Sequence, residues 1–147
     1  MTTDQVLAMA RRLMAEVDIA TSTVTDEEIL EAVYDARDLF ELQRLTDFIN
    51  LVVGTDQAEP TTYGIKPDPT LEQGVLLAHK ASVDLLRTTY LGRVSRGELG
   101  TSWSSGLESE STIQAQKAYR DAIDGIESQL TALILVKRSP TAGYRIQ

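Results

Sequence analysis

Four short segments of this sequence have the pattern of a helix N-terminus, and they constrain where helices can begin. In each, a threonine or serine is followed three residues later by glutamine or glutamate. This is the capping box, in which the two residues exchange side-chain to backbone hydrogen bonds. The segments are 2–5, 25–28, 70–73 and 111–114. Because amphipathic stretches follow these caps, the sequence predicts a helical protein with little strand.

The spacing of apolar residues gives the expected extent of each helix. We expect helices over 4–17, over 26–54, over 71–92 and after Ser111. The apolar face turns by roughly half a circle within the second helix, so either one long helix packs on both sides or the helix breaks. We favour a break or kink near Asp38, followed by a helix that ends at Gly54.

The segments between the predicted helices complete the expected fold. Residues 55–69 contain three of the four prolines and read as a long loop. The third helix has apolar residues around most of its circumference, which predicts a central position or a contact with another subunit. Pro140 and Gly143 stop the last helix. The prediction is an all-α bundle of four to five helices with long loops, in one domain over 1–138, followed by an extended C-terminal arm over 139–147.

The charge of the chain restricts its partners. The net charge is −8, and residues 137–147 carry +3, which leaves −11 on the rest. An acidic body argues against binding nucleic acid through its phosphates, and the basic end predicts contact with an acidic surface. Cysteine is absent, so disulfides and thiolate metal sites are excluded. No secretory signal or membrane-spanning stretch is visible, so we expect the protein to stay where it is made.

Few residues could carry chemistry. His79 is the only histidine, and its place beside the apolar stripe of its helix favours a half-buried packing role. Arg87, Arg93 and Arg96 could contact phosphates, but the acidic residues of the loop that follows oppose this. No plausible catalytic pocket is indicated, and we expect neither enzymatic activity nor a cofactor.

Four carboxylates are spaced to share one side of the second predicted helix: Glu27, Glu31, Asp35 and Asp38. Such a row could bind a divalent ion or hold an acid of raised pKa, because crowded like charges resist joint ionisation. A solvated surface is favoured, since Arg37 and Arg44 lie nearby and no calcium-binding loop is present. A third interpretation is the wall of an acidic channel.

Residues 92–110 are rich in glycine and serine yet contain Leu99, Trp103 and Leu107. A loop of this length in a compact domain is usually functional or disordered, and aromatic residues are preferred anchors at interfaces. We therefore expect these three side chains to contact another subunit or a partner protein.

Several segments together resemble the head-to-tail connector adaptors of tailed phages and related viruses. They are TDEEIL at 25–30, LLAHKASVDLLR at 76–87, GELGTSWSSGLESES at 97–111 and TIQAQKAY at 112–119, followed by a short extended C-terminus. The resemblance covers most of the chain as a pattern, although the proline-rich loop at 55–69 departs from the simplest such bundles.

The resemblance implies a structural virion protein, made in the host cytoplasm and located at the neck. It would form a dodecameric ring under the portal, lengthen the DNA channel without binding DNA specifically, and support the stopper or tail-completion protein. The C-terminal segment would bind the portal through Lys137, Arg138, Tyr144, Arg145, Ile146 and Gln147. The alternatives are another neck or tail-completion protein, and a cellular helical protein-interaction module.

Overall fold

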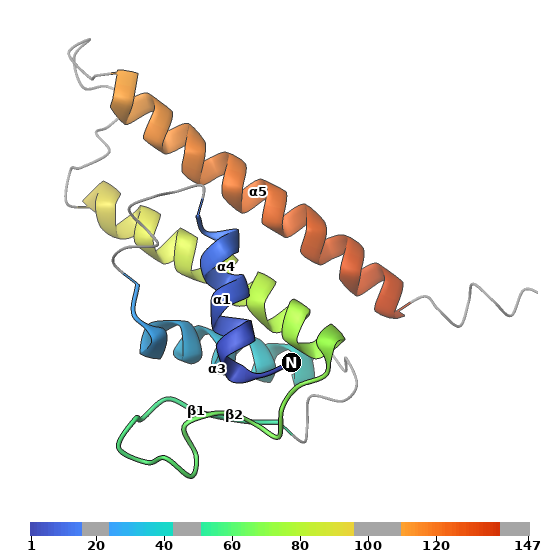
Figure 1. Ribbon diagram of the computed structural model, residues 1–147. Helices are drawn as coiled ribbons and strands as arrows, with labels where there is room; N and C mark the ends of the chain where they lie inside the picture. Colours follow the sequence, from blue (N-terminus) through green and yellow to red (C-terminus); the bar gives the residue numbers. More distant parts are fainter. Residues whose placement is uncertain (16–23, 43–50, 96–109, 139–147) are drawn as a thin grey trace, which may run out of the picture.

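The structure is a computed structural model that describes residues 1–15, 24–42, 51–95 and 110–138. Within these residues, four helices pack together with one small antiparallel hairpin (Figure 1). The helices are α1 (Thr3–Leu13), α3 (Asp26–Leu42), α4 (Leu71–Ser95) and α5 (Glu110–Arg138), and the strands are β1 (Val52–Gly54) and β2 (Gly64–Lys66). The predicted helical fold is therefore confirmed, with a small sheet added to it.

Three of the predicted caps are present with both reciprocal hydrogen bonds. The Gln5 amide donates to Thr2 Oγ1 at 3.2 Å, and the Thr2 amide donates to Gln5 Oε1 at 2.8 Å. The same exchange starts α3 at Thr25 and α4 at Thr70. The fourth predicted cap is wrong, because α5 begins at Glu110 and Ser111 already lies inside the helix.

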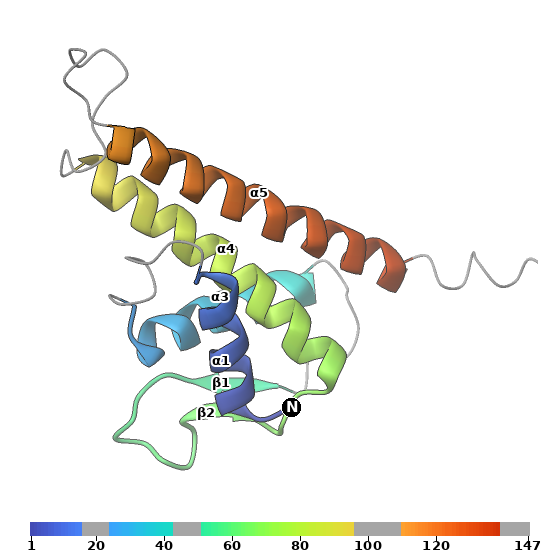
Figure 2. The same ribbon diagram turned by 45° about the horizontal axis from the view of Figure 1, so that its top comes forward.

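Helix α4 lies at the centre of the bundle, and α1, α3 and α5 all pack against it (Figures 1 and 2). This explains the apolar residues around its circumference, which the sequence analysis interpreted as a central position or a subunit contact. The buried apolar side chains of α4 face different neighbours: Leu76, Leu77, Ala78, Ala81, Val83 and Leu86. Their burial stabilises the fold, because the removal of apolar surface from water is the main driving force of folding.

Helix α3 does not break near Asp38, contrary to the prediction. It continues to Leu42, with no proline or glycine to interrupt it. The inward face that begins at Ile29 extends through Val33 and Ala36 to Phe40, which is fully buried. The burial of Phe40 thus stabilises one further turn of the helix. The apolar residues that follow on the rotated face lie largely outside the described residues.

The predicted helix end at Gly54 is also wrong, because Val52–Gly54 forms β1. Val53 pairs with Ile65 of β2, and both side chains are buried, whereas Val52 is exposed. Gly54 allows close approach within the hairpin, since a Cβ there would lie 1.8 Å from Thr62 O. In a strand with one buried face, buried and exposed side chains alternate with a period of two. A segment of only a few residues is too short to show this period, so it can be mistaken for part of a helical pattern.

Helix α5 runs antiparallel to α4 (Figure 2). It buries Tyr119, Ala122, Ile126 and Leu130, whereas Leu133 is exposed. None of the described helices is long and apolar enough to cross a membrane.

Candidate functional site

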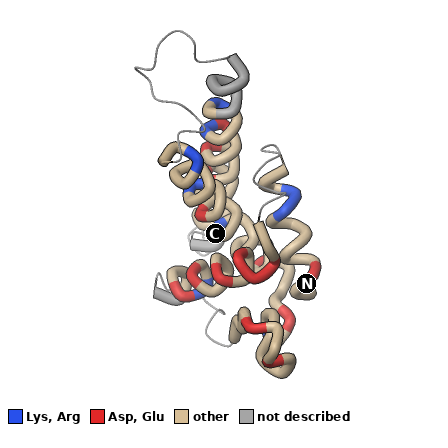
Figure 3. Tube along the Cα trace, turned by 90° about the vertical axis from the view of Figure 1, so that its left-hand side faces the viewer, with Lys and Arg blue, Asp and Glu red and all other residues tan. Residues whose placement is uncertain are grey.

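The acidic row of α3 lies on the outside of the bundle. Glu27, Glu31 and Asp35 are exposed, and Asp38 is partly buried beside Arg37. At 100° per residue the four carboxylates fall within about 80° of the helix circumference. Figure 3 shows the acidic residues following one another along this helix. The sequence prediction of a shared acidic side is confirmed.

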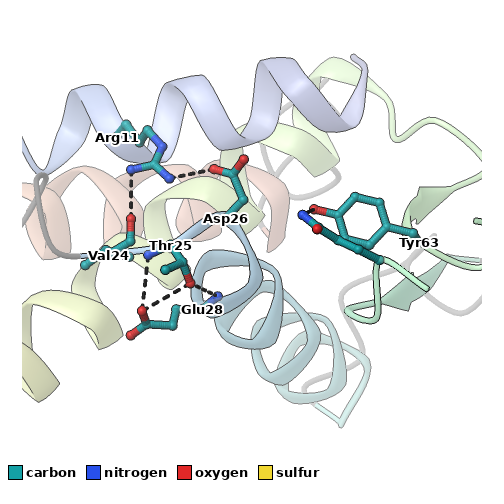
Figure 4. A network of polar contacts seen from close by, with 7 residues as sticks. Arg11, Val24, Thr25, Asp26, Glu28 and Tyr63 are labelled. Atoms are coloured by element: carbon teal, nitrogen blue, oxygen red, sulfur yellow. Dashed lines mark hydrogen bonds and ion pairs between the residues drawn. The ribbon is translucent and has the colours of Figure 1, made fainter. Parts of the chain in front are cut away.

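Helix α3 is fixed in its orientation from both ends. At its start, Arg11 of α1 donates to Val24 O at 3.0 Å and to Asp26 Oδ1 at 2.5 Å (Figure 4). Further along, Arg37 donates from Nε to Leu51 O at 2.9 Å and from Nη1 to Asp38 Oδ1 at 3.2 Å. Partly exposed ion pairs contribute at most about 1 kcal/mol each, so their main effect here is to set the direction in which the acidic side faces.

The hairpin is tied to the same part of the bundle. The Ile65 amide of β2 donates to Thr3 Oγ1 at 2.9 Å, which joins the sheet to the first turn of α1. At the hairpin loop, Gln57 Nε2 donates to the Tyr63 hydroxyl at 3.3 Å. Strand β1 packs beside α3, and Glu27, Glu31 and Asp35 of the acidic row remain exposed.

We predict that the acidic row holds no required metal. Among the described residues, no group of three or more histidine, cysteine, aspartate or glutamate side chains is arranged to hold an ion. Calcium sites need six to eight converging oxygen ligands, usually from a loop, whereas a helix side spreads its carboxylates apart. Treatment with a chelator should leave the melting temperature unchanged. A drop of several degrees, reversed by adding a divalent ion, would contradict this prediction.

His79 bridges α4 and α5. Its Nδ1 lies 2.7 Å from Val75 O and its Nε2 lies 3.1 Å from Gln129 Oε1. The residue is more deeply buried than the half-buried position predicted for it. The ring lies between the two helices and contacts both of them, so the geometry is that of a packing residue.

An aromatic and arginine cluster between α4 and α5 was missed by the sequence analysis. The Tyr90 and Tyr119 ring centroids are 5.4 Å apart, and the Arg93 guanidinium lies 5.7 Å from the centre of the Tyr119 ring. Arg87 forms an ion pair with Glu127 beside a cavity of about 280 Å³. Arg93 is buried in this cluster, whereas Arg87 pairs with Glu127 at a partly exposed position.

The other predicted site residues lie at the edge of, or outside, the described residues. Lys137 and Arg138 are the last two residues of α5, so their backbone is helical. The remaining predicted interface and arm residues lie outside the described ranges: Leu99, Trp103, Leu107, Tyr144, Arg145, Ile146 and Gln147.

No protein-family model, curated protein or solved structure matches this chain. Three features of the chain bear on its function: the outward acidic side of α3, the exposed leucines at the two ends of α4, and the basic residues at the C-terminal end of the sequence.

Proposed function

We propose that this chain is a head-to-tail adaptor, a structural subunit that forms a ring beneath the portal of a tailed virus. The ring lengthens the DNA channel and provides a platform for the stopper or tail-completion protein. The observation that supports this best is the exposed acidic side of α3, with Glu27, Glu31 and Asp35 turned to solvent. This acidic side of α3 is the proposed face of the channel.

An acidic lining suits a channel that DNA must pass. Helix α3 contains seven acidic residues and one arginine. Repeated around a ring, this charge repels DNA phosphates, so the genome slides through without binding to the wall. A protein that held DNA would instead place arginine and lysine at the contact. An acidic channel face is thus chemically consistent with DNA that passes through the ring without binding to it.

The mass of the protein in solution tests this proposal. The full chain, purified at physiological salt, is expected to form assemblies of about twelve copies of the 16.2 kDa subunit in mass photometry. Dimers at every concentration would overturn the ring and favour a cellular protein-interaction module.

Trp103 is predicted to contribute to assembly. Glycine and serine neighbours offer it little apolar surface, and aromatic residues are favoured interface anchors. The substitution Trp103→Ala should weaken assembly at least tenfold, with the helix content of the monomer in circular dichroism unchanged. Loss of helix content would instead make Trp103 part of the core. Leu99→Ala and Leu107→Ala are expected to act in the same direction with smaller effects.

A further inference from the structure

A shallow groove lies between α1 and the first turn of α4. Its volume is about 320 Å³, and the residues that line it are Met1, Gln5, Ala8, Arg12 and Leu71. The spacing of Gln5, Ala8 and Arg12 places these side chains within about 60° of the circumference of α1. All three are exposed, and Leu71 at the start of α4 is 70% exposed. The described part of the chain therefore leaves the groove open to solvent.

The charged groups that line the groove are both cations. Arg12 forms no ion pair with the described residues, whereas its neighbour Arg11 is paired with Asp26. The second cation is the ammonium of Met1, which donates a hydrogen bond to Pro69 O at 2.8 Å. The N-terminus accordingly lies beside the start of α4 in both views (Figures 1 and 2). An ammonium has three hydrogens, so this contact uses only one of its donors.

The neutral polar side chain of the groove can also act as a donor. In the capping box, Gln5 Oε1 accepts from the Thr2 amide at 2.8 Å, which leaves Gln5 Nε2 to donate elsewhere. Glu72 follows Leu71 in the sequence but is not among the residues that line the groove. Within the described residues, the groove thus presents hydrogen-bond donors and no carboxylate. An ionised carboxylate is the side chain that fits such a set, because it only accepts hydrogen bonds.

The rest of the lining is apolar. Met1 is seated on α4 at Gly74, where an added Cβ would lie 2.2 Å from Met1 Sδ. Together with Ala8 and the exposed Leu71, Met1 forms an apolar strip beside the cations. A bound small molecule usually buries most of its surface in a cavity, which a groove this shallow does not provide. A protein segment suits the groove better, because its flanking residues can cover the surrounding surface.

We propose that this groove binds an acidic segment of a partner protein. A carboxylate of the segment pairs with Arg12, and a large apolar side chain next to that carboxylate covers Leu71. The pairing of opposite charges sets the orientation of the segment, and the burial of Leu71 supplies the apolar part of the affinity. All residues of the groove belong to one copy of the chain, so the inference does not depend on the proposed ring.

Fluorescence anisotropy with labelled nine-residue peptides tests the groove on the full chain. The probe has one leucine between two glutamates, in a background of glycine and serine. Two matched peptides replace the glutamates with lysine or the leucine with serine. The chain has a net charge of −8, so its overall field favours the lysine peptide. We expect the probe to bind at least tenfold more tightly than either matched peptide, a preference that only local contacts can produce.

Substitutions in the chain place the binding in the groove. Arg12→Glu should weaken binding of the probe at least tenfold and shift the preference toward the lysine peptide. Leu71→Ser should weaken binding severalfold without this shift. Arg120→Glu is the matched control, because Arg120 is also an exposed arginine but lies on α5. It makes the same change in net charge and should leave the affinity for the probe unchanged.

Three outcomes would overturn the proposal. The first is the absence of saturable binding of the probe, and the second is binding that Arg12→Glu and Leu71→Ser leave unchanged. The third is self-association of the chain that Arg12→Glu abolishes and Arg120→Glu does not, which would assign the groove to a contact between copies. Because the probe binds a single copy, its affinity can be measured whether or not the chain forms the proposed ring.

Discussion

Replacing Tyr119 with alanine is expected to destabilise the bundle by about 3–5 kcal/mol, the usual cost of removing a buried aromatic side chain. Tyr119 is the largest fully buried side chain of the described residues and lies between α4 and α5. Its loss leaves a cavity and deprives the buried Arg93 guanidinium of the ring it faces. With a typical urea dependence for a domain of this size, the midpoint of unfolding should fall by about 2 M.

The matched control is Tyr119→Phe, which keeps the ring and removes only the hydroxyl. That hydroxyl lies 3.5 Å from Arg93 Nη1, a long contact, so the expected cost is below about 1 kcal/mol. Both variants should be measured as dissociated monomers, because assembly adds stability that depends on concentration. An alanine variant as stable as the phenylalanine variant would show that α5 does not pack on α4 through Tyr119.

Removal of residues 139–147 is expected to abolish portal binding while leaving the bundle nearly as stable as before. Helix α5 ends at Arg138, so the truncation removes no residue of the described helices. The deleted segment contains Tyr144 and Ile146, whose spacing would place both on the same side of a strand, and the basic Arg145. Portal affinity measured by interferometry should fall at least a hundredfold, and the melting temperature should change by less than about 2 °C.

Point substitutions separate the apolar and electrostatic parts of this binding. Replacing both Tyr144 and Ile146 with serine should weaken portal binding at every salt concentration. Arg145→Ala should make the affinity less dependent on salt, because a screened charge pair has been removed. Unchanged portal affinity of the truncated chain would contradict the proposed arm and would favour a C-terminal segment that contacts its own acidic body.

Local chemistry accounts for most of what the sequence predicted correctly. Three of the four predicted capping boxes are confirmed, because threonine and the glutamine or glutamate three residues later satisfy backbone groups within one helical turn. The central place of α4 and the outward acidic side of α3 also followed from residue spacing alone. Such features depend on the spacing of residues within one helix, and these are the patterns that a sequence displays directly.

The hairpin and the contact of Tyr119 with Arg93 were missed because they depend on residues that are distant in the sequence. Val52 and Val53 were assigned to a helix, although two consecutive β-branched residues before a proline-rich loop also favour a strand. Their partner strand begins ten residues beyond the end of β1, and the pairing is closed by Thr3 at the start of the chain. The Tyr119 and Arg93 contact was missed for the same reason, since nothing local to either residue indicates the other.

Negative-stain imaging of the purified chain, alone and mixed with a candidate portal protein, tests the proposed ring. If the chain is a head-to-tail adaptor, we expect closed rings of about twelve copies that stack coaxially on the portal, with a continuous central channel. Discrete dimers, or rings that never associate with the portal, would contradict it.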